Sequence, residues 1–304
     1  MKDKITAENF NEYIKLHTVR KITLGKSGSD IYELDNSCIA KHSRRKKLKK
    51  DSLWNPFVCE YMFYNHFSSG SYCFLPEIYY CNQSKDEIQI IMKKYQPLNR
   101  QNFDDDMLEK IMSVLAQIHS LSVPNFLQSE NKPLVLKQWD ILRYSRAWKK
   151  IVKEHGDAFS KNDISRIAEN INTLNLKLHS TKQRLCHGDF HLENLLEDDK
   201  GNIIVCDWQG VSLGNISGDI SHFLSRLSAD GYNISKEKAI QIYCKYARTD
   251  ITEEEIAIQM SLANLNNSFM FWHDYLHGCT EDAVHNIFDK MVEDMEFLLS
   301  KIDN

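Results

Sequence analysis

Short runs in which apolar and polar residues alternate dominate the first third of the chain, after one short helical segment. Residues 20–34, RKITLGKSGSDIYEL, hold two such runs joined by a Gly/Ser turn, and residues 35–43 add a turn and a third run. Alternation with a period of two is typical of strands, while Gly and Ser favour turns. The pattern predicts a three-stranded meander, followed by a helix over 55–67 and a further strand over 88–92.

Long helices dominate the chain from about residue 104 onward. Acidic residues suited to a helix N-terminus open the segment 104–121. Its apolar residues recur at helical spacing and form one face, namely Leu108, Ile111, Leu115 and Ile118. We expect His119, at the end of this helix, to be a packing or capping residue. Further helical patterns occupy 138–178, 218–229, 236–247 and 253–302.

A β-like segment interrupts the helices at 185–206, where two apolar runs flank the turn EDDKGN and predict a hairpin. The chain is therefore predicted to have an α+β fold, with a small antiparallel β-sheet lobe followed by a larger, mainly helical lobe. A length of 304 residues suits such a division. We place the N-terminal lobe at 1–95 and the C-terminal helical lobe at 96–304.

Composition and charge narrow the classes of partner. The chain is 42% hydrophobic and 26% charged, with a formal net charge of −4, which gives no electrostatic reason to expect nucleic acid as a partner. The basic run 44–50 is expected to be a solvated loop. The N-terminus lacks the apolar core of a signal peptide and no run of about 18 apolar residues occurs, so we expect a cytoplasmic protein without a membrane partner. The eight cysteines contain no C-x-x-C pair and are expected to be reduced.

The Gly/Ser turn raises the question of a phosphate-binding loop. A P-loop would require glycine at position 20, which is Arg20, and a helix after the loop, whereas the residues after it look like a strand. A flexible hairpin whose backbone N–H groups cover phosphates and an ordinary β-turn both remain open. Lys41 on the third run and Glu60 on the following helix would each pass for a surface charge if considered alone.

The segment LCHGDFHLENLL, at 185–196, carries the strongest chemical signal. Asp189 and Asn194 have the spacing D-x-x-x-x-N, and Asp207 follows after the predicted hairpin, which could return its carboxylate to Asn194. Phosphoryl transfer needs an aspartate that accepts or orients a hydroxyl proton, together with an amide oxygen and a second carboxylate for Mg²⁺.

A zinc cluster is the alternative interpretation of this segment, because imidazole and thiolate are favoured zinc ligands. The candidate ligands are Cys186, His187, Asp189 and His191. In an extended segment, successive side chains point to opposite sides, so adjacent residues cannot easily converge on one ion. We expect His187 to be a structural hydrogen-bonding residue of the loop and His191 to be exposed.

The order of these features is that of the eukaryotic-type kinase fold. More narrowly, CHGDFHLENLL, IIVCDWQGVSLGNISGDISHFL and LAQIHSL resemble the aminoglycoside phosphotransferase and choline kinase family of small-molecule kinases. The resemblance runs from about residue 20 to 228 and implies a two-lobed, protein-kinase-like fold. It also implies that the N-terminal lobe binds the nucleotide, while the helical lobe holds the catalytic loop and the acceptor.

The resemblance implies roles for individual residues. Asp189 matches the catalytic aspartate, Asn194 and Asp207 match the Mg²⁺ ligands, and Asp219 matches an aspartate that is usually structural. The positions implied to contact or position the ATP or GTP donor are Lys41, Glu60, Gly25, Ser27, Gly28, Met92 and Tyr95.

Departures from the protein-kinase pattern argue against a protein substrate. His-Gly-Asp stands in place of His-Arg-Asp, the stretch 207–209 reads Asp-Trp-Gln in place of Asp-Phe-Gly, and no Ala-Pro-Glu follows. We expect a small-molecule acceptor walled by the aromatic segment 266–278 and the acidic segment 280–297, in a monomer or weak dimer. An aminoglycoside-like acceptor is favoured, with choline, an amino alcohol or a sugar as alternatives. A non-catalytic nucleotide-binding module and a metal-dependent phosphohydrolase are the competing functions.

Overall fold

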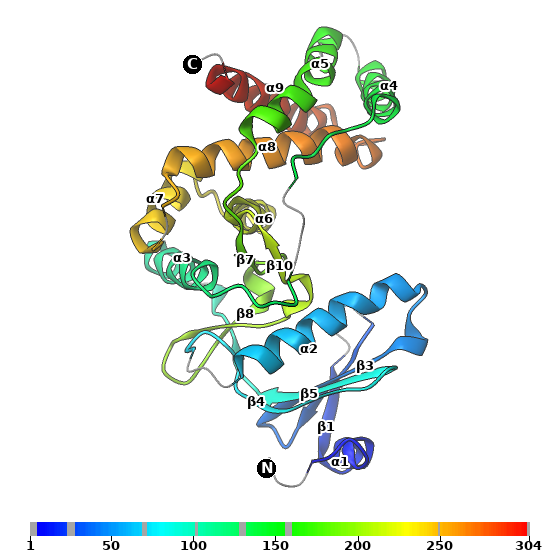
Figure 1. Ribbon diagram of the computed structural model, residues 1–304, viewed down its shortest axis with the longest axis vertical. Helices are drawn as coiled ribbons and strands as arrows, with labels where there is room; N and C mark the ends of the chain where they lie inside the picture. The colour runs from blue at the N-terminus through cyan, green and yellow to red at the C-terminus, as the bar shows by residue number, and fades with distance from the viewer. Residues whose placement is uncertain are drawn as a thin grey trace.

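The computed structural model describes residues 5–22, 28–68, 72–100, 103–127, 132–155, 160–248 and 250–302. A sheet-rich N-terminal part lies at one end of the molecule and a helical C-terminal part at the other (Figure 1). Helix α1 (Phe10–His17) precedes a five-stranded antiparallel sheet of order β1-β2-β3-β5-β4, and α2 (Asn55–Phe67) packs against β4 and β5. The strands are β1 (Thr18–Ile22), β2 (Asp30–Leu34), β3 (Cys38–Arg44), β4 (Ile78–Gln83) and β5 (Glu87–Lys93).

The predicted meander, the helix over 55–67 and the strand over 88–92 are confirmed as β1 to β3, α2 and β5. Strand β4 was not predicted, because its sequence IYYCNQ does not alternate and its first five residues are all half-buried. The central position of β3 places Lys41 opposite Ile31 of β2 on one side and Ile90 of β5 on the other. Lys41 therefore lies on a central strand that has a paired strand on each side.

The basic run 44–50 differs in part from the solvated loop that we expected. It begins with the last residue of β3, continues as a short 3-10 turn, and supplies Arg44 and Lys47 as partners for the buried carboxylate of Asp30. Lys21 is a third partner, with Nζ 2.8 Å from Asp30 Oδ1. Burial alone would raise the pKa of Asp30, but hydrogen bonds from Lys21 and Lys47 lower it to about 2.

The helical part holds seven long helices and two small sheets in the described residues, and its strands pair as β10–β7 and as β6–β8–β9. The helices are α3 (Asp105–His119), α4 (Gln138–Glu154), α5 (Lys161–Leu178), α6 (Ile216–Ala229), α7 (Lys236–Tyr246), α8 (Glu253–Phe271) and α9 (Glu281–Ile302). The strands are β6 (Gln96–Pro97), β7 (Arg184–Cys186), β8 (Leu195–Glu197), β9 (Ile203–Val205) and β10 (Ser212–Gly214).

Local sequence explains where these helices begin and end. The side chain of Asp104 accepts a hydrogen bond from the backbone N–H of Met107, at 2.9 Å, and caps α3, whose four predicted apolar residues are all buried. The patterns 138–178 and 253–302 are each two helices rather than one, and Gly278, at φ +72°, lies in the turn between α8 and α9. Among the described helices, none is long and apolar enough to cross a membrane.

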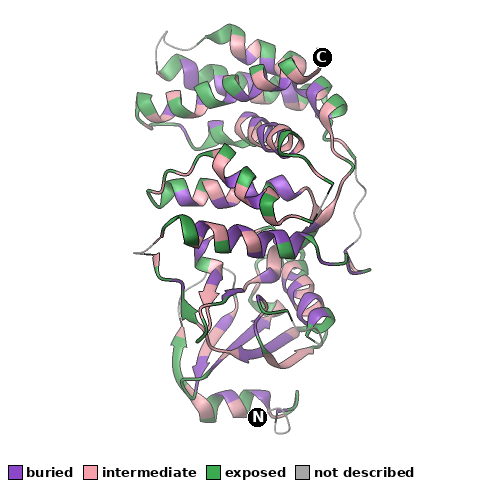
Figure 2. Cartoon of the chain, turned by 90° about the vertical axis from the view of Figure 1, so that its left-hand side faces the viewer, coloured by how far each residue is buried: buried purple, intermediate pink, exposed green. Residues whose placement is uncertain are grey.

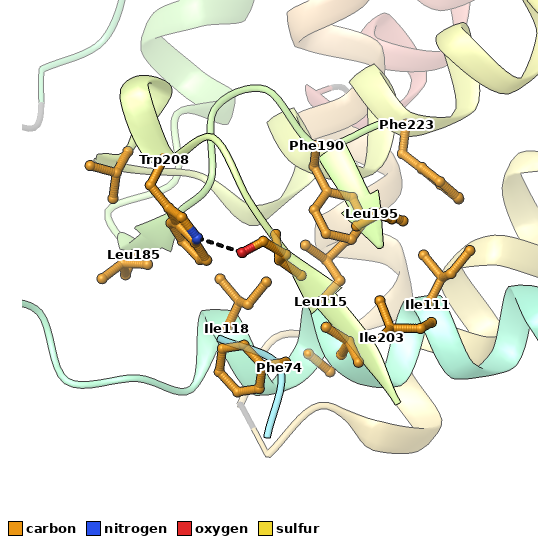
Figure 3. Close-up of a cluster of buried hydrophobic side chains, with 14 of the residues drawn as sticks. Phe74, Ile111, Leu115, Ile118, Leu185, Phe190, Leu195, Ile203, Trp208 and Phe223 are labelled. Atoms are coloured by element: carbon orange, nitrogen blue, oxygen red, sulfur yellow. Dashed lines mark hydrogen bonds between the residues drawn. The ribbon is translucent and has the colours of Figure 1, made fainter. Parts of the chain in front are cut away.

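One buried apolar cluster runs from α2 through β5, α3 and the predicted hairpin to α6 and α7. Figure 3 shows its centre, where Phe190, Trp208 and Phe223 lie above the apolar face of α3. The ring of Trp208 stacks on Phe63 of α2 at 3.8 Å between centroids, so the two parts share this core. Figure 2 shows that the stacked helices have buried residues on the faces that point toward neighbouring elements and exposed residues on their outer faces. A second buried cluster joins α4, α5, α8 and α9. The boundary at residue 95 stays a prediction.

Candidate active site

Lys41, Glu60 and Asp207 come from three different elements and meet at one point. The Nζ atom of Lys41 lies 2.9 Å and 2.8 Å from the two carboxylate oxygens of Glu60 on α2, and 2.9 Å from Oδ1 of Asp207. Lys41 and Glu60 are buried, whereas the Asp207 side chain is 38% exposed. The structure therefore brings together a strand lysine, a helical glutamate and the aspartate that follows the hairpin.

One cation faces two carboxylates in this cluster. Burial would lower the pKa of Lys41, but the charges of Glu60 and Asp207 raise it above its usual value, so the ammonium stays charged. Burial, together with the charge of Asp207, raises the pKa of Glu60 to about 6 in spite of Lys41. The excess negative charge lies on the exposed side of the cluster, where carboxylate oxygens suit a hard divalent cation.

The loop that follows β7 depends on a glycine. Gly188 has φ +79°, and a Cβ atom there would lie 2.0 Å from the carbonyl oxygen of Gly210. The backbone N–H of Asp189 donates to Nδ1 of the buried His187 at 3.2 Å, so the ring's proton is on Nε2 and is donated to the carbonyl of Cys206 at 3.0 Å. Burial lowers the pKa of His187 and keeps it neutral. His187 is the structural residue that we expected, and it ties the loop to β9.

Asp219, at the start of α6, holds the same loop from the other side. Its two oxygens accept hydrogen bonds from the backbone N–H groups of His187, at 2.7 Å, and Gly188, at 2.8 Å. His119 Nε2 lies 3.1 Å from Asp219, and its Nδ1 lies 2.9 Å from the hydroxyl of Tyr243. Burial alone would raise the pKa of Asp219, but these hydrogen bonds lower it. His119 is thus a buried link between α3, α6 and α7, a role that sequence reasoning missed.

The predicted hairpin returns Asp207 to the neighbourhood of Asn194. The amide nitrogen of Asn194 donates to the carbonyl of Asp189 at 2.8 Å, while its backbone carbonyl accepts from the N–H of Cys206 at 2.9 Å. The amide oxygen is therefore the atom of the Asn194 side chain that is left for a cation. Asp207 adopts a left-handed conformation, with φ 62° and ψ 62°, which costs about 1–3 kcal/mol for a non-glycine residue.

Two imidazoles flank the carboxylate of Asp189. His222 Nε2 lies 3.2 Å from Oδ1, and His191 Nε2 lies 3.5 Å from Oδ2. Contacts with His191 and His222 hold the pKa of Asp189 well below its usual range, so this half-exposed carboxylate is ionised at neutral pH. His222 escaped the sequence reasoning, because its contact with Asp189 depends on how α6 packs against the loop.

The four candidate ligands of the alternative zinc site do not converge among the described residues. Cys186 groups with the buried pair His119 and Asp219, while His187 turns to Cys206. Burial raises the pKa of the Cys186 thiol well above its usual value and disfavours a thiolate. Asp189 and His191 instead group with His222. The alternative interpretation as a four-residue zinc cluster is therefore not supported, because the four side chains belong to separate groups.

The remaining predicted nucleotide contacts are placed only in part. Gly25 and Ser27 lie outside the described residues, and Gly28, at φ +83°, directly precedes the segment that leads into β2. Met92 is buried on β5, and the hydroxyl of the half-buried Tyr95 accepts a hydrogen bond from the backbone N–H of Glu77 at 2.9 Å. The roles of these residues toward a nucleotide stay predictions.

The two segments expected to wall the acceptor differ in placement. Phe269 is a core residue, whereas Phe271, Trp272 and Tyr275 are exposed at the end of α8. Helix α9 packs on α8 and α5, on the side of α8 that faces away from the sheet (Figure 1). The exposed aromatic residues therefore remain candidates for an acceptor wall, while the acidic helix α9 lies on the far side of α8 from the sheet.

Comparisons with known proteins agree with this geometry. The model of the phosphotransferase enzyme family matches residues 84–252, which is more than half of the chain. The search of curated proteins found no match to this chain. The streptomycin–ATP complex of APH(2")-IIa is 19% identical over 96% of this chain and 98% of that chain, with a TM-score of 0.57. A GDP complex of an aminoglycoside 2'-phosphotransferase-IIIa mutant is 13% identical over 97% and 95%, with a TM-score of 0.60. The amicoumacin kinase hAmiN is 12% identical over 97% and 95%, with a TM-score of 0.56.

At these identities the solved structures show a shared fold, so the predicted two-lobed, kinase-like α+β fold is confirmed. The family match, which includes the loop 187–194 and Asp207, confirms the prediction of a phosphotransferase. The chain belongs to the phosphotransferase enzyme family.

Proposed function

We propose that this protein is a Mg²⁺-dependent kinase that transfers the γ-phosphate of ATP or GTP to a hydroxyl group of a small molecule. One observation carries the proposal: Lys41 Nζ lies within 2.9 Å of both Glu60 and Asp207, beside a loop that presents Asp189 and Asn194. A charged lysine held between two carboxylates suits the α- and β-phosphates of a nucleotide together with their metal ion.

The residues present fit Mg²⁺, because the amide oxygen of Asn194 and the carboxylate of Asp207 are hard oxygen ligands in a cluster with excess negative charge. A bound Mg²⁺ would neutralise charge on the transferring phosphates. Lys41 would contact the donor phosphates, held in place by Glu60. Asp189, ionised at neutral pH, would accept the acceptor's hydroxyl proton in a hydrogen bond and orient the oxygen toward the phosphate.

The donor would lie between the Gly/Ser hairpin and the strand connection that follows β5. Gly25, Ser27 and Gly28 would cover the phosphates with backbone N–H groups, and the stretch from Met92 to Tyr95 would pack against the base. These assignments follow from the resemblance and leave the choice between ATP and GTP to a direct assay with both.

An aminoglycoside-like acceptor is our leading proposal, with choline, an amino alcohol or a sugar as alternatives. Trp272 and Tyr275 are exposed at the end of α8, with ring centroids 6.2 Å apart, and the carboxylate of Asp274 between them is 73% exposed. Exposed rings beside a carboxylate suit an acceptor that carries both a ring and an ammonium group. A panel of these acceptors, each assayed with ATP and GTP, would separate the alternatives.

Asp189→Asn tests the mechanism, with Asp289→Asn on the surface of α9 as the matched control. We expect the Asp189 variant to lose transfer by about 10² to 10⁴-fold while nucleotide binding, measured by calorimetry, stays near wild type. Asp289→Asn, in which a 66% exposed carboxylate is replaced, should leave both properties unchanged. Retained transfer in Asp189→Asn would exclude this mechanism, and binding without transfer to any acceptor would indicate a non-catalytic module.

A metal-dependent phosphohydrolase is the second candidate, because Asp189, His191 and His222 each offer a ligand atom within 4.8 Å of the others. This function requires a tightly bound transition metal. Elemental analysis of the purified protein, followed by phosphate-release assays without acceptor, decides between the two: a stoichiometric transition metal with acceptor-independent hydrolysis favours the phosphohydrolase.

A further inference from the structure

We propose that His222 is a positioning residue that orients the carboxylate of Asp189 for phosphoryl transfer. The proposal rests on the kinase function above and adds a residue that the implied site does not contain. His222 Nε2 lies 3.2 Å from Asp189 Oδ1, closer than either contact on the other oxygen, where His191 Nε2 lies at 3.5 Å and Asn194 Nδ2 at 3.4 Å. Oδ1 of Asp189 thus faces His222, and Oδ2, whose contacts are longer, is left for an acceptor hydroxyl.

Solvent cannot serve as the partner of this imidazole nitrogen. The Nε2 atom of His222 is itself buried, although the side chain as a whole is 40% exposed, and it has no aligned hydrogen bond within the described part of the chain. Asp189 Oδ1 is the acceptor within reach. A small rotation of either side chain would align the proton on Nε2 with this oxygen, and a charge-assisted hydrogen bond would form.

The helix that carries His222 is fixed against the loop that carries Asp189. Asp219, one turn earlier on α6, accepts two hydrogen bonds from the loop backbone. Phe190 and Phe223, which directly follow Asp189 and His222, are both fully buried and pack together with ring centroids 5.6 Å apart (Figure 3). The hydrogen bonds to Asp219 and the packing of the two rings fix α6 against the loop. The imidazole of His222 is therefore held beside the carboxylate of Asp189.

The benefit of this contact is greatest in the transition state. The side chain of Asp189 is 48% exposed, so water competes for its oxygens and its rotamer is not fixed by packing alone. A carboxylate that is already oriented spares the cost of ordering it when the acceptor hydroxyl must point at the phosphate. Loss of one hydrogen bond to a charged group should lower kcat by about tenfold or more. Binding of acceptor and nucleotide should change little.

His222→Ala, His222→Gln and His222→Asn test the proposal, with His285→Ala as a control on another helical histidine that neighbours carboxylates, at 3.6 Å from Glu281. We expect His222→Ala to lower kcat about tenfold or more at saturating acceptor, with the acceptor KM and the nucleotide Kd within about twofold of wild type. Glutamine places an N–H donor near the position of Nε2 and should restore most of kcat. Asparagine is too short and should not, while His285→Ala should behave like wild type.

An unchanged kcat in His222→Ala would overturn the proposal, as would a loss that glutamine and asparagine repair equally. If His222→Ala does not fold, the glutamine and asparagine pair decides alone. In the background Asp189→Asn, the His222 substitution should cause no further loss, because it acts through Asp189. Failure of the proposed kinase mechanism is distinguished by the Asp189→Asn variant. If that variant transfers phosphate as fast as wild type, the mechanism itself is wrong, whatever the His222 variants do.

Discussion

Replacing Asp219 by asparagine should strongly destabilise the protein, because this carboxylate satisfies donors that an amide cannot satisfy. Its two oxygens accept hydrogen bonds from the backbone N–H groups of His187 and Gly188, and His119 adds a third contact at 3.1 Å. In Asp219→Asn, one oxygen becomes an NH₂ group that faces a backbone N–H, so one buried donor loses its partner in either orientation of the amide.

The loss of stability in Asp219→Asn follows from the burial of this side chain and from the hydrogen bonds that it accepts. Asp219 is 2% exposed, so water cannot replace the lost partner. Loss of a hydrogen bond to a charged group costs about 1.5–3 kcal/mol, and the unpaired buried N–H adds about 1–3 kcal/mol, which together suggest about 3–5 kcal/mol. For a chain of this length, about 2 °C is lost for each kcal/mol, so the melting temperature should fall by about 6–10 °C.

Thermal unfolding followed by circular dichroism measures this change, with Asp289→Asn as the control for the substitution itself. The exposed Asp289 should tolerate the change with a shift near zero. A melting temperature of Asp219→Asn within about 2 °C of wild type would show that the loop does not depend on this carboxylate. Activity should fall together with stability, because the loop of Asp189 loses an anchor.

The pH dependence follows from the lowered pKa of Asp219 in the folded protein. A carboxyl group whose folded pKa is depressed contributes stability that is present above its unfolded pKa of about 3.9 and is lost as pH falls toward the folded value. The difference in melting temperature between wild type and Asp219→Asn should therefore be constant above about pH 5 and narrow below about pH 4. A difference that widens on acidification would contradict this reasoning.

Three further substitutions test other parts of the site. Gly188→Ala should destabilise the fold by about 3 kcal/mol or more and abolish transfer, since its Cβ would lie 2.0 Å from the Gly210 carbonyl, and a near-normal melting temperature would contradict this. Trp208→Phe should cost about 1–3 kcal/mol in denaturant unfolding, because the indole N–H donates to a buried carbonyl at 2.9 Å, and an unchanged midpoint would refute it. Lys41→Met should remove nucleotide binding in calorimetry, and it leaves the Glu60 carboxylate without its cation. Retained nucleotide affinity would argue against a contact between Lys41 and the phosphates.

Periodicity predicted those parts of the fold in which one face of an element is buried. The apolar face of α3 was readable because its four residues recur at helical spacing and all are buried. Strand β4 was not, because its residues are half-buried on both sides and do not alternate. The breaks between α4 and α5 and between α8 and α9 were also missed, since both halves of each pattern carry the same apolar spacing.

The site was predictable where its chemistry is local in the sequence. The spacing of Asp189 and Asn194 fits one loop, and the hairpin after it is short enough to return Asp207. The contacts of His119 and His222 were not predictable, because they depend on how α3 and α6 pack against the loop. His119 meets a residue 100 positions away, and His222 meets one 33 positions earlier, and neither distance leaves a local pattern.

Buried aromatic rings fix the position of the acidic residues in this site. Asp189 is followed by Phe190, which packs on Phe223, and Asp207 is followed by Trp208, which stacks on Phe63 one turn after Glu60 on α2. Such ring pairs contribute about 0.5–1.5 kcal/mol beyond their buried area, and they hold the adjacent carboxylates against mutual repulsion and, at position 207, against backbone strain. Substitutions of the rings should therefore lower stability and activity together. Substitution of His222, whose side chain is 40% exposed and packs on neither ring pair, should lower activity alone.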